Sequence, residues 1–151
     1  MSALTEDVEF TERIEFPSKA ENIHLVERMI DDVCHRYAVH ESHYGNILIA
    51  LTEAVNNAIH HGNRLDPAKQ VTVGYKVAGE KVTFVVSDQG PGFDHDHLPD
   101  PTDPENIEKP HGRGVFLMRA LADEVSFDDN GASVAMTFSL WISAFAAAIV
   151  D

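Results

Sequence analysis

Residues 46–63 read NILIALTEAVNNAIHHGN, and at helical spacing their side chains divide into an apolar and a polar face. Glu53, Asn57 and His60 are neighbours on the polar face because they lie four and three residues apart. That face carries little of the charge that is usual where a helix only meets solvent. We therefore expect this helix to form the wall of a site and to end at Gly62 in a left-handed cap. The apolar face consists of Ile47, Leu48, Leu51, Ala54, Val55, Ala58 and Ile59.

The composition is that of a soluble globular chain with room for one hydrophobic core. Of its 151 residues, 44% are hydrophobic and 24% are charged. The formal net charge of −14 would repel nucleic acid and anionic membranes, so we expect neither as a general partner. A polyanion such as ATP would need backbone amides, a helix N-terminus or a metal ion to overcome this field.

Several absences in the sequence favour a cytoplasmic protein. The single cysteine, Cys34, cannot form an internal disulfide, and its helical context is more typical of a buried small side chain than of a nucleophile. The N-terminal segment lacks the apolar core of a secretory signal. No apolar run approaches the roughly 20 residues that span a bilayer. Residues 140–151 form an apolar tail, which we expect to pack on the core or at a subunit contact of a possible homodimer.

The order of predicted elements indicates an α+β fold. Residues 8–16 alternate as an edge strand, and a helix over about 19–37 follows, with Ser18 and Glu21 as its capping box. Glu41 or Ser42 opens the helix described above. The rest of the chain predicts a hairpin of strands 70–77 and 81–87, a helix over 115–122, and a strand pair, 125–128 and 133–140.

These elements predict a two-layer sandwich, in which a mixed, mostly antiparallel sheet has its helices packed on one face. Hairpin-connected strands account for most of the sheet, and we find no internal repeat and no second domain. Residues 95–111 contain four prolines and show no periodicity. A connection of this length within a compact domain is usually either functional or disordered.

Two further segments could contribute to the site. Asp88 ends a predicted strand, and Gly90 and Gly92 after it would let the backbone approach a ligand closely. Gly112 and Gly114 precede a helix, whose free amides could bind an anion. Each pattern alone is common in ordinary turns and hinges.

Together, EAVNNA at 53–58, DQGPG at 88–92 and GRG at 112–114 resemble the motifs of the GHKL, or Bergerat-fold, ATPases. That group includes gyrase, heat-shock chaperones, MutL proteins and sensor histidine kinases. LTEAVNNAIHHGN and HGRGVFLMRALADEV look most similar to bacterial anti-sigma-factor serine/threonine kinases of the RsbW and SpoIIAB kind. The resemblance covers almost the whole chain, so it implies a single ATP-binding domain over 1–151. It also implies ATP and Mg²⁺ as ligands, and a sigma factor and an STAS-type antagonist as protein partners.

The resemblance implies a role for each motif residue. Asn57 would bind Mg²⁺ through its amide oxygen, and Glu53 would act as the general base on the attacking hydroxyl. Asp88 would accept a hydrogen bond from the adenine amino group. Residues 95–111 would close over the triphosphate as a lid. The remaining nucleotide contacts would come from Gly90, Gly92, Gly112 and Gly114 through the backbone, and from Lys109, His111 and Arg113 through positive charge.

Two positions depart from the pattern of this family. Many relatives have Gly-Thr in the last hairpin, whereas this chain has Gly131 followed by Ala132 and Ser133, so Ser133 substitutes for the threonine or the adenine contact is absent. The lid has Pro110 where an arginine is expected. Nucleotide binding tolerates both changes more easily than phosphoryl transfer does.

Three other interpretations compete with the kinase. A non-catalytic module could use ATP as a switch for binding a partner. A domain of a histidine relay is disfavoured, because no dimerisation helix with an acceptor histidine precedes it. A transition-metal site is also disfavoured, because His60 and His61 point about 100° apart on a helix, and the His95 and His97 pair lies in a polar loop.

Overall fold

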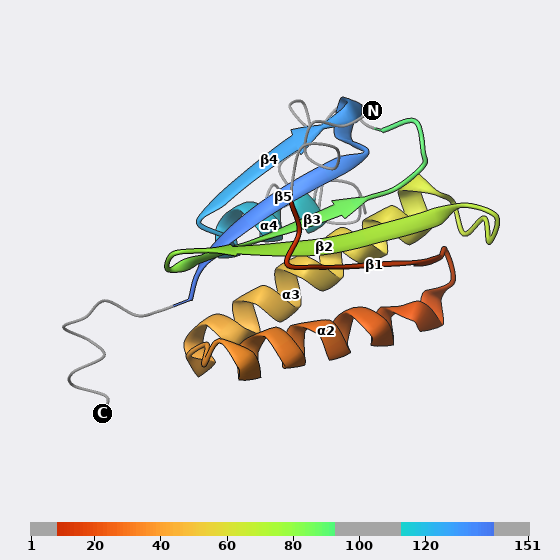
Figure 1. Ribbon diagram of the computed structural model, residues 1–151. Helices are drawn as coiled ribbons and strands as arrows, with labels where there is room; N and C mark the ends of the chain where they lie inside the picture. The colour runs from red at the N-terminus through yellow and green to blue at the C-terminus, as the bar shows by residue number, and fades with distance from the viewer. Residues whose placement is uncertain (1–8, 93–112, 141–151) are drawn as a thin grey trace.

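The computed structural model describes residues 9–92 and 113–140 of the chain. A five-stranded sheet forms one layer, and α-helices cover one of its faces as the second layer (Figure 1). The predicted two-layer α+β sandwich is therefore confirmed. The apolar tail predicted at 140–151 lies outside the described residues apart from Leu140, which is buried.

All strand pairings in the described sheet are antiparallel, in the order β1-β2-β3-β5-β4. The edge position predicted for the first strand is confirmed, and this strand ends at Pro17, where a missing N–H costs no central ladder bond. The strands are β1 (Glu12–Pro17), β2 (Gln70–Ala78), β3 (Lys81–Ser87), β4 (Glu124–Asp128) and β5 (Ser133–Ser139).

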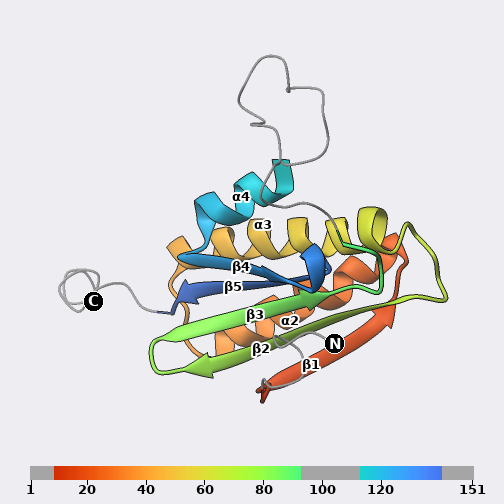
Figure 2. The ribbon, with the colours of Figure 1, turned by 90° about the horizontal axis from the view of Figure 1, so that it is seen from above.

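Within the described residues, α3 packs between two other α-helices, and Figure 2 shows α4 alongside α3. These helices are α2 (Ile23–Arg36), α3 (Glu41–Asn57) and α4 (Arg113–Leu121). Short turns adjoin them: η1 (Ala20–Asn22) before α2, the π-helical η2 (Ala58–Gly62) after α3, and η4 (Asp129–Gly131) between β4 and β5. No described helix combines the length and the apolarity needed to cross a membrane.

The hydrophobic core lies between the sheet and α2 and α3. The predicted apolar face of α3 is buried there, with Leu48 only partly covered. Side chains on alternate positions of the central strands meet it, such as Val73 on β2, Val86 on β3 and Val134 on β5, which lie in register. Burying this face fixes the rotation of α3 about its axis, so its polar face is directed toward α4.

The predicted capping box at the first helix is wrong. Ser18 is buried, and its hydroxyl donates to the carbonyl of Lys69 at 2.8 Å and accepts from the side chain of Asn63 at 2.7 Å. The chain therefore enters α2 through the turn η1, at which no side chain caps the N-terminus. The side-chain Nδ2 of Asn22 donates to the carbonyl of Pro17 at 2.8 Å and connects this turn to β1.

The predicted left-handed cap at Gly62 is also wrong. The last turn of α3 widens into η2, and the positive φ angles fall two and three residues after Gly62, at Arg64 (φ 54) and Leu65 (φ 61). The amide of Leu65 donates to the carbonyl of Ile59 at 2.8 Å and closes the helix end. Glycine is needed at position 62 for a different reason, because a side chain there would overlap the carboxylate of Asp88.

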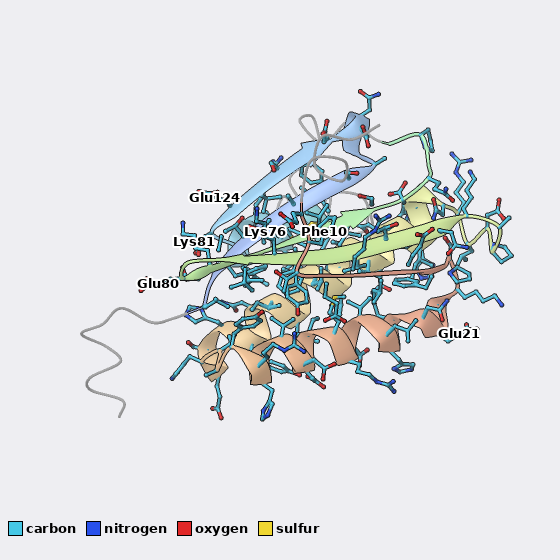
Figure 3. The ribbon with its side chains drawn as sticks, in the orientation of Figure 1. Phe10, Glu21, Lys76, Glu80, Lys81 and Glu124 are labelled. Atoms are coloured by element: carbon cyan, nitrogen blue, oxygen red, sulfur yellow. The ribbon has the colours of Figure 1, made fainter. Side chains whose placement is uncertain are left out.

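β3 begins after a short hairpin turn, where Figure 3 shows Glu80 and Lys81. Ala78 pairs with Lys81, so only Gly79 and Glu80 form the turn, and Gly79 has φ 61 as such turns require. This confirms the predicted hairpin, with β2 one residue longer.

Phe10, also labelled in Figure 3, lies against Gly74 on β2, where an added Cβ would come within 2.6 Å of its ring.

Candidate functional site

The site predicted from sequence lies where β3 and α3 end. In Figure 2 the chain leaves β3 beside the last turns of α3. Asp88 follows β3 directly, and its amide donates to the carbonyl of Ala132 at 2.9 Å, next to β5. The tertiary fold therefore brings together two predicted motifs and the last hairpin. The first residues of the two motifs, Glu53 and Asp88, are 35 positions apart in the sequence.

The carboxylate of Asp88 lies directly against the backbone of Gly62. A Cβ added to Gly62 would come within 2.4 Å of the carboxylate, a separation that real side chains do not reach. One carboxylate oxygen, Oδ1, accepts from the amide of Gly90 at 2.8 Å. Glycine at position 62 thus permits the close approach of Asp88 to the end of α3.

Burial raises the pKa of the Asp88 carboxyl from 3.8 to about 6. Removal from water disfavours the charged form, while the amide of Gly90 and the positive charge of Lys69 partly oppose the shift. Near neutral pH the group is therefore mostly ionised, and within residues 9–92 and 113–140 its carboxylate accepts a hydrogen bond only from the amide of Gly90. A donor from a ligand would offset its desolvation.

The glycines after Asp88 sit where the backbone segments nearly touch. A Cβ on Gly90 would come within 2.0 Å of the carbonyl oxygen of Gly62. Gly92 has φ +81, and a Cβ there would come within 2.1 Å of the carbonyl oxygen of Asn130. Both positions exclude a side chain, so the predicted close backbone approach is made here to the protein's own helix end and last hairpin.

Glu53 and Asn57 share one half-buried stretch of α3, and α4 packs against it at Gly114. A Cβ on Gly114 would lie 2.7 Å from Nδ2 of Asn57 and 3.2 Å from Oε2 of Glu53. The third predicted motif is therefore in contact with the first. Neither polar side chain forms a hydrogen bond to a residue within 9–92 or 113–140, so both retain their capacity to bind a ligand.

Ser133 is buried beside Asp88 rather than exposed for contact. Its hydroxyl lies 2.8 Å from that of Ser87 across the β3–β5 pair and 3.5 Å from Oδ2 of Asp129. Because Ser87 immediately precedes Asp88, this pair of hydroxyls helps to hold the strand end. Its adenine contact stays a prediction.

Several predicted residues lie outside the described part of the chain. These are the lid, 95–111, with Lys109 and His111, and also Gly112. Arg113 is described, exposed at the first position of α4. His60 and His61 are exposed on η2. Among the described residues, no three histidine, cysteine, aspartate or glutamate side chains gather as metal ligands would.

Sequence reasoning missed two residues of this site. The sequence pattern predicts a helix cap at Gly62 and no separate role for Asn63. Asn63 is buried, and its side-chain oxygen accepts from the amide of Gln89, next to Asp88, at 2.7 Å. A Gly-Asn pair after a helix is ordinary turn sequence, so no local signal distinguishes these roles.

Comparisons with known proteins agree on one family. The model of the histidine kinase-like ATPase domain matches residues 16–138. The serine-protein kinase RsbW of Bacillus licheniformis is 30% identical over 128 residues, and that of Staphylococcus epidermidis is 29% identical over 128 residues, covering 80% of each chain in both cases. A crystal structure of the RsbU and RsbW domains of a Mycobacterium tuberculosis protein has a TM-score of 0.59 at 16% identity, over 86% of this chain and 32% of that chain, which shows the fold alone.

Proposed function

The chain belongs to the histidine kinase-like ATPase domain family, and on this premise we propose that it is an ATP-dependent serine/threonine protein kinase of the RsbW kind. The observation that carries the proposal is that the second and third motifs both contact the segment of α3 and η2 that contains the first. Asp88 lies against Gly62, and Gly114 lies against Glu53 and Asn57. One nucleotide could therefore meet all three segments.

Asp88 would recognise the adenine base. Its carboxylate is partly desolvated and receives only the Gly90 amide among described residues, so it can accept the hydrogen bond of an exocyclic amino group. A purine with a carbonyl oxygen at that position would face the carboxylate with an acceptor. Such a pair leaves a desolvated charge without a donor and costs affinity.

Asn57 would bind the Mg²⁺ that accompanies ATP. The ion prefers oxygen ligands, and the amide side chain of Asn57 is half-buried with no described hydrogen-bond partner, so the donor type fits. When bound, the ion neutralises charge on the phosphates. The backbone of Gly114 lies beside Asn57 at the start of α4, where helix amides favour an anion.

Glu53 would act as the general base. It lies one helical turn before Asn57, and Gly114 contacts both. The hydroxyl oxygen of a protein serine or threonine attacks the γ-phosphorus of ATP. The bond between the γ-phosphorus and the β–γ bridging oxygen breaks, and ADP leaves. The hydroxyl proton passes to the carboxylate of Glu53, so the products are a phosphoprotein, ADP and a protonated base.

The proposed partners are a sigma factor, which the protein would sequester, and an STAS-type antagonist, which it would phosphorylate. Support comes from similarity to proteins named serine-protein kinase RsbW. A cytoplasmic location and a homodimer belong to the same proposal. The described residues contain no motif that identifies either partner.

Radiolabelled ATP tests the transfer step. Wild-type protein with a candidate antagonist should label serine or threonine, whereas Glu53→Ala should bind ATP and transfer about a hundredfold or more slowly. Glu41→Ala is the matched control, because Glu41 lies exposed in the first turn of the same helix. Tight ATP binding by wild type without labelling of any antagonist would instead favour the non-catalytic module.

Binding itself has a separate test with two variants. Asp88→Asn should lose most of the affinity for ATP, because an asparagine whose oxygen accepts from the amide of Gly90 turns its NH₂ group, a donor, toward the amino group of the base. Asn57→Ala should remove the Mg²⁺ dependence of binding, and the exposed neighbour Asn56→Ala should leave it unchanged. An unchanged dissociation constant in Asp88→Asn, measured by calorimetry, would rule out the adenine assignment.

A further inference from the structure

Asn63 connects the end of α3 with three other segments of the chain. It is 1% exposed, and its Nδ2 donates to the hydroxyl of Ser18 at 2.7 Å and to the carbonyl of Gln70 at 2.9 Å. Its Oδ1 accepts from the amide of Gln89 at 2.7 Å. The side chain therefore uses both of its donor hydrogens and one acceptor within the protein.

These bonds fall into two arms with different targets. The donor arm reaches Ser18, before α2, and Gln70, at the start of β2, and neither adjoins the candidate site residues in sequence. The acceptor arm reaches the amide nitrogen of Gln89, which is covalently bonded to the carbonyl carbon of Asp88. The acceptor arm is therefore the one that bonds directly to the peptide between Asp88 and Gln89.

Gln89 strengthens the same attachment with its own side chain. Its Oε1 accepts from the amide of Gln70 at 2.7 Å, so this exposed residue is fixed at its backbone and at its side chain. Asp88 is thus held on both sides, by Ala132 at its own amide and by Asn63 at the amide that follows. Its carboxylate has little freedom to turn away from Gly62.

We propose that Asn63 is a positioning residue for base recognition, which orients Asp88 through the amide of Gln89. The inference rests on the proposed function, because it takes Asp88 as the residue that contacts the base. A merely structural Asn63 would support the fold and affect all nucleotides alike. A positioning Asn63 sets the preference for a purine with an exocyclic amino group over one with a carbonyl oxygen.

The experiment compares ATP with inosine triphosphate, which carries oxygen in place of the amino group. Asn63→Leu keeps the branched side-chain skeleton but removes both arms, and Ser18→Ala removes a partner of the donor arm only. We expect Asn63→Leu to weaken ATP binding about tenfold and to reduce the preference for ATP by a similar factor, the worth of about one hydrogen bond. Ser18→Ala should lower the melting temperature but keep the wild-type preference.

Asn63→Asp provides the second variant should Asn63→Leu not fold. It keeps an acceptor oxygen for Gln89, so it should retain more of the ATP preference than Asn63→Ala. Equal losses of affinity for both nucleotides in all folded Asn63 variants would overturn the positioning role, but they would not contradict the proposal that the wild-type protein binds ATP. A wild-type protein that binds neither nucleotide would overturn the proposed function first.

Amide hydrogen exchange without nucleotide gives an independent readout. Exchange of the Gln89 amide should accelerate in Asn63→Leu and stay slow in Ser18→Ala, because the side-chain oxygen of Asn63 accepts its proton and Ser18 does not contact it. Slow exchange at Gln89 in Asn63→Leu would show that another contact fixes Asp88, and would overturn the proposal whatever the nucleotide affinities are.

Discussion

The two ends of β3 are built by different means. At its start, Gly79 and Glu80 make a two-residue turn, and a Cβ on Gly79 would meet nothing within 4 Å. At its end, the segment from Asp88 to Gly92 touches the end of α3 and the last hairpin, with no room for a Cβ at Gly90 or Gly92. The turn depends on local backbone preference, and the site depends on distant contacts. Substitutions at the two ends should therefore fail in different ways.

The largest effect should come from Gly62→Ala. The Cβ of the new alanine would lie 2.4 Å from the carboxylate of Asp88 and overlap it. Asp88 must therefore move, or the helix end must unwind. We expect a loss of about 2–3 kcal/mol in the free energy of unfolding and at least tenfold weaker ATP binding. Urea unfolding and calorimetry measure the two quantities. Unchanged ATP affinity would show that the position of Asp88 does not matter for binding.

A smaller and purely local effect should follow from Gly79→Ala. The φ angle of 61 disfavours a side chain, but the space around the turn is open. We expect a loss of about 1 kcal/mol in stability, with ATP affinity unchanged. A change in affinity comparable to that of Gly62→Ala would contradict the separation of the two ends.

Asp88→Asn should reveal the electrostatic cost of the site. The raised pKa, about 6 against 3.8, means that the folded protein holds a proton in this window that the unfolded chain releases. Wild-type stability therefore falls as the pH rises from about 4 to about 6. Without nucleotide, the free energy of unfolding of Asp88→Asn relative to wild type should rise by about 1 kcal/mol when the pH is raised from 4 to 7.5. This is less than the full pKa shift implies, because solvent screens the group in part.

Urea unfolding of both proteins at the two pH values checks this prediction. The difference between variant and wild type should be small at pH 4 and should favour the variant at pH 7.5. A difference that does not depend on pH would show that burial does not raise the pKa of Asp88. The same variant should bind ATP poorly, so stability and binding would change in opposite directions.

The smallest effect should be a gain from Arg64→Gly. Arg64 occupies the left-handed position that ends α3, with φ 54. Glycine would relieve this strain at some cost in unfolded-chain entropy, for a net gain of about 0.5 kcal/mol. Arg64→Ala is the matched control, because it removes the charge and keeps the unfavourable backbone. A gain in melting temperature of equal size in both variants would assign the effect to charge instead.

Elements with a strong periodic pattern were predictable from the sequence. The apolar spacing predicts the buried face of α3, and the structure confirms it except at Leu48, which is only partly buried. The alternating segments predict the hairpin, and the structure confirms that β2 and β3 pair. The three motifs were predictable as a group only through their resemblance to a family. Their mutual contact is visible only in the fold, because it joins Gly62 to Asp88 and Gly114 to Asn57.

The two wrong predictions share one physical cause. Ser18 has the residue type of a helix cap, and Gly62 has that of a left-handed end, so local preference alone assigned them to those tasks. In the fold, the Ser18 hydroxyl bonds to Lys69 and Asn63, and Gly62 makes room for Asp88. A buried hydrogen bond or a close contact outweighs a preference worth about 1 kcal/mol.

The sequence by itself determined which faces are apolar, where strands and helices run, and which family the motifs resemble, because these properties depend on residues close together in the chain. Only the tertiary structure decided how Asp88 is held. Gly62, Asn63 and Ala132 reach it from two other parts of the chain, and their roles depend on distances that no local pattern encodes. The polar face of α3 depends on both levels. The spacing of Glu53 and Asn57 on one face follows from the sequence, whereas their contact with Gly114 exists only in the tertiary structure.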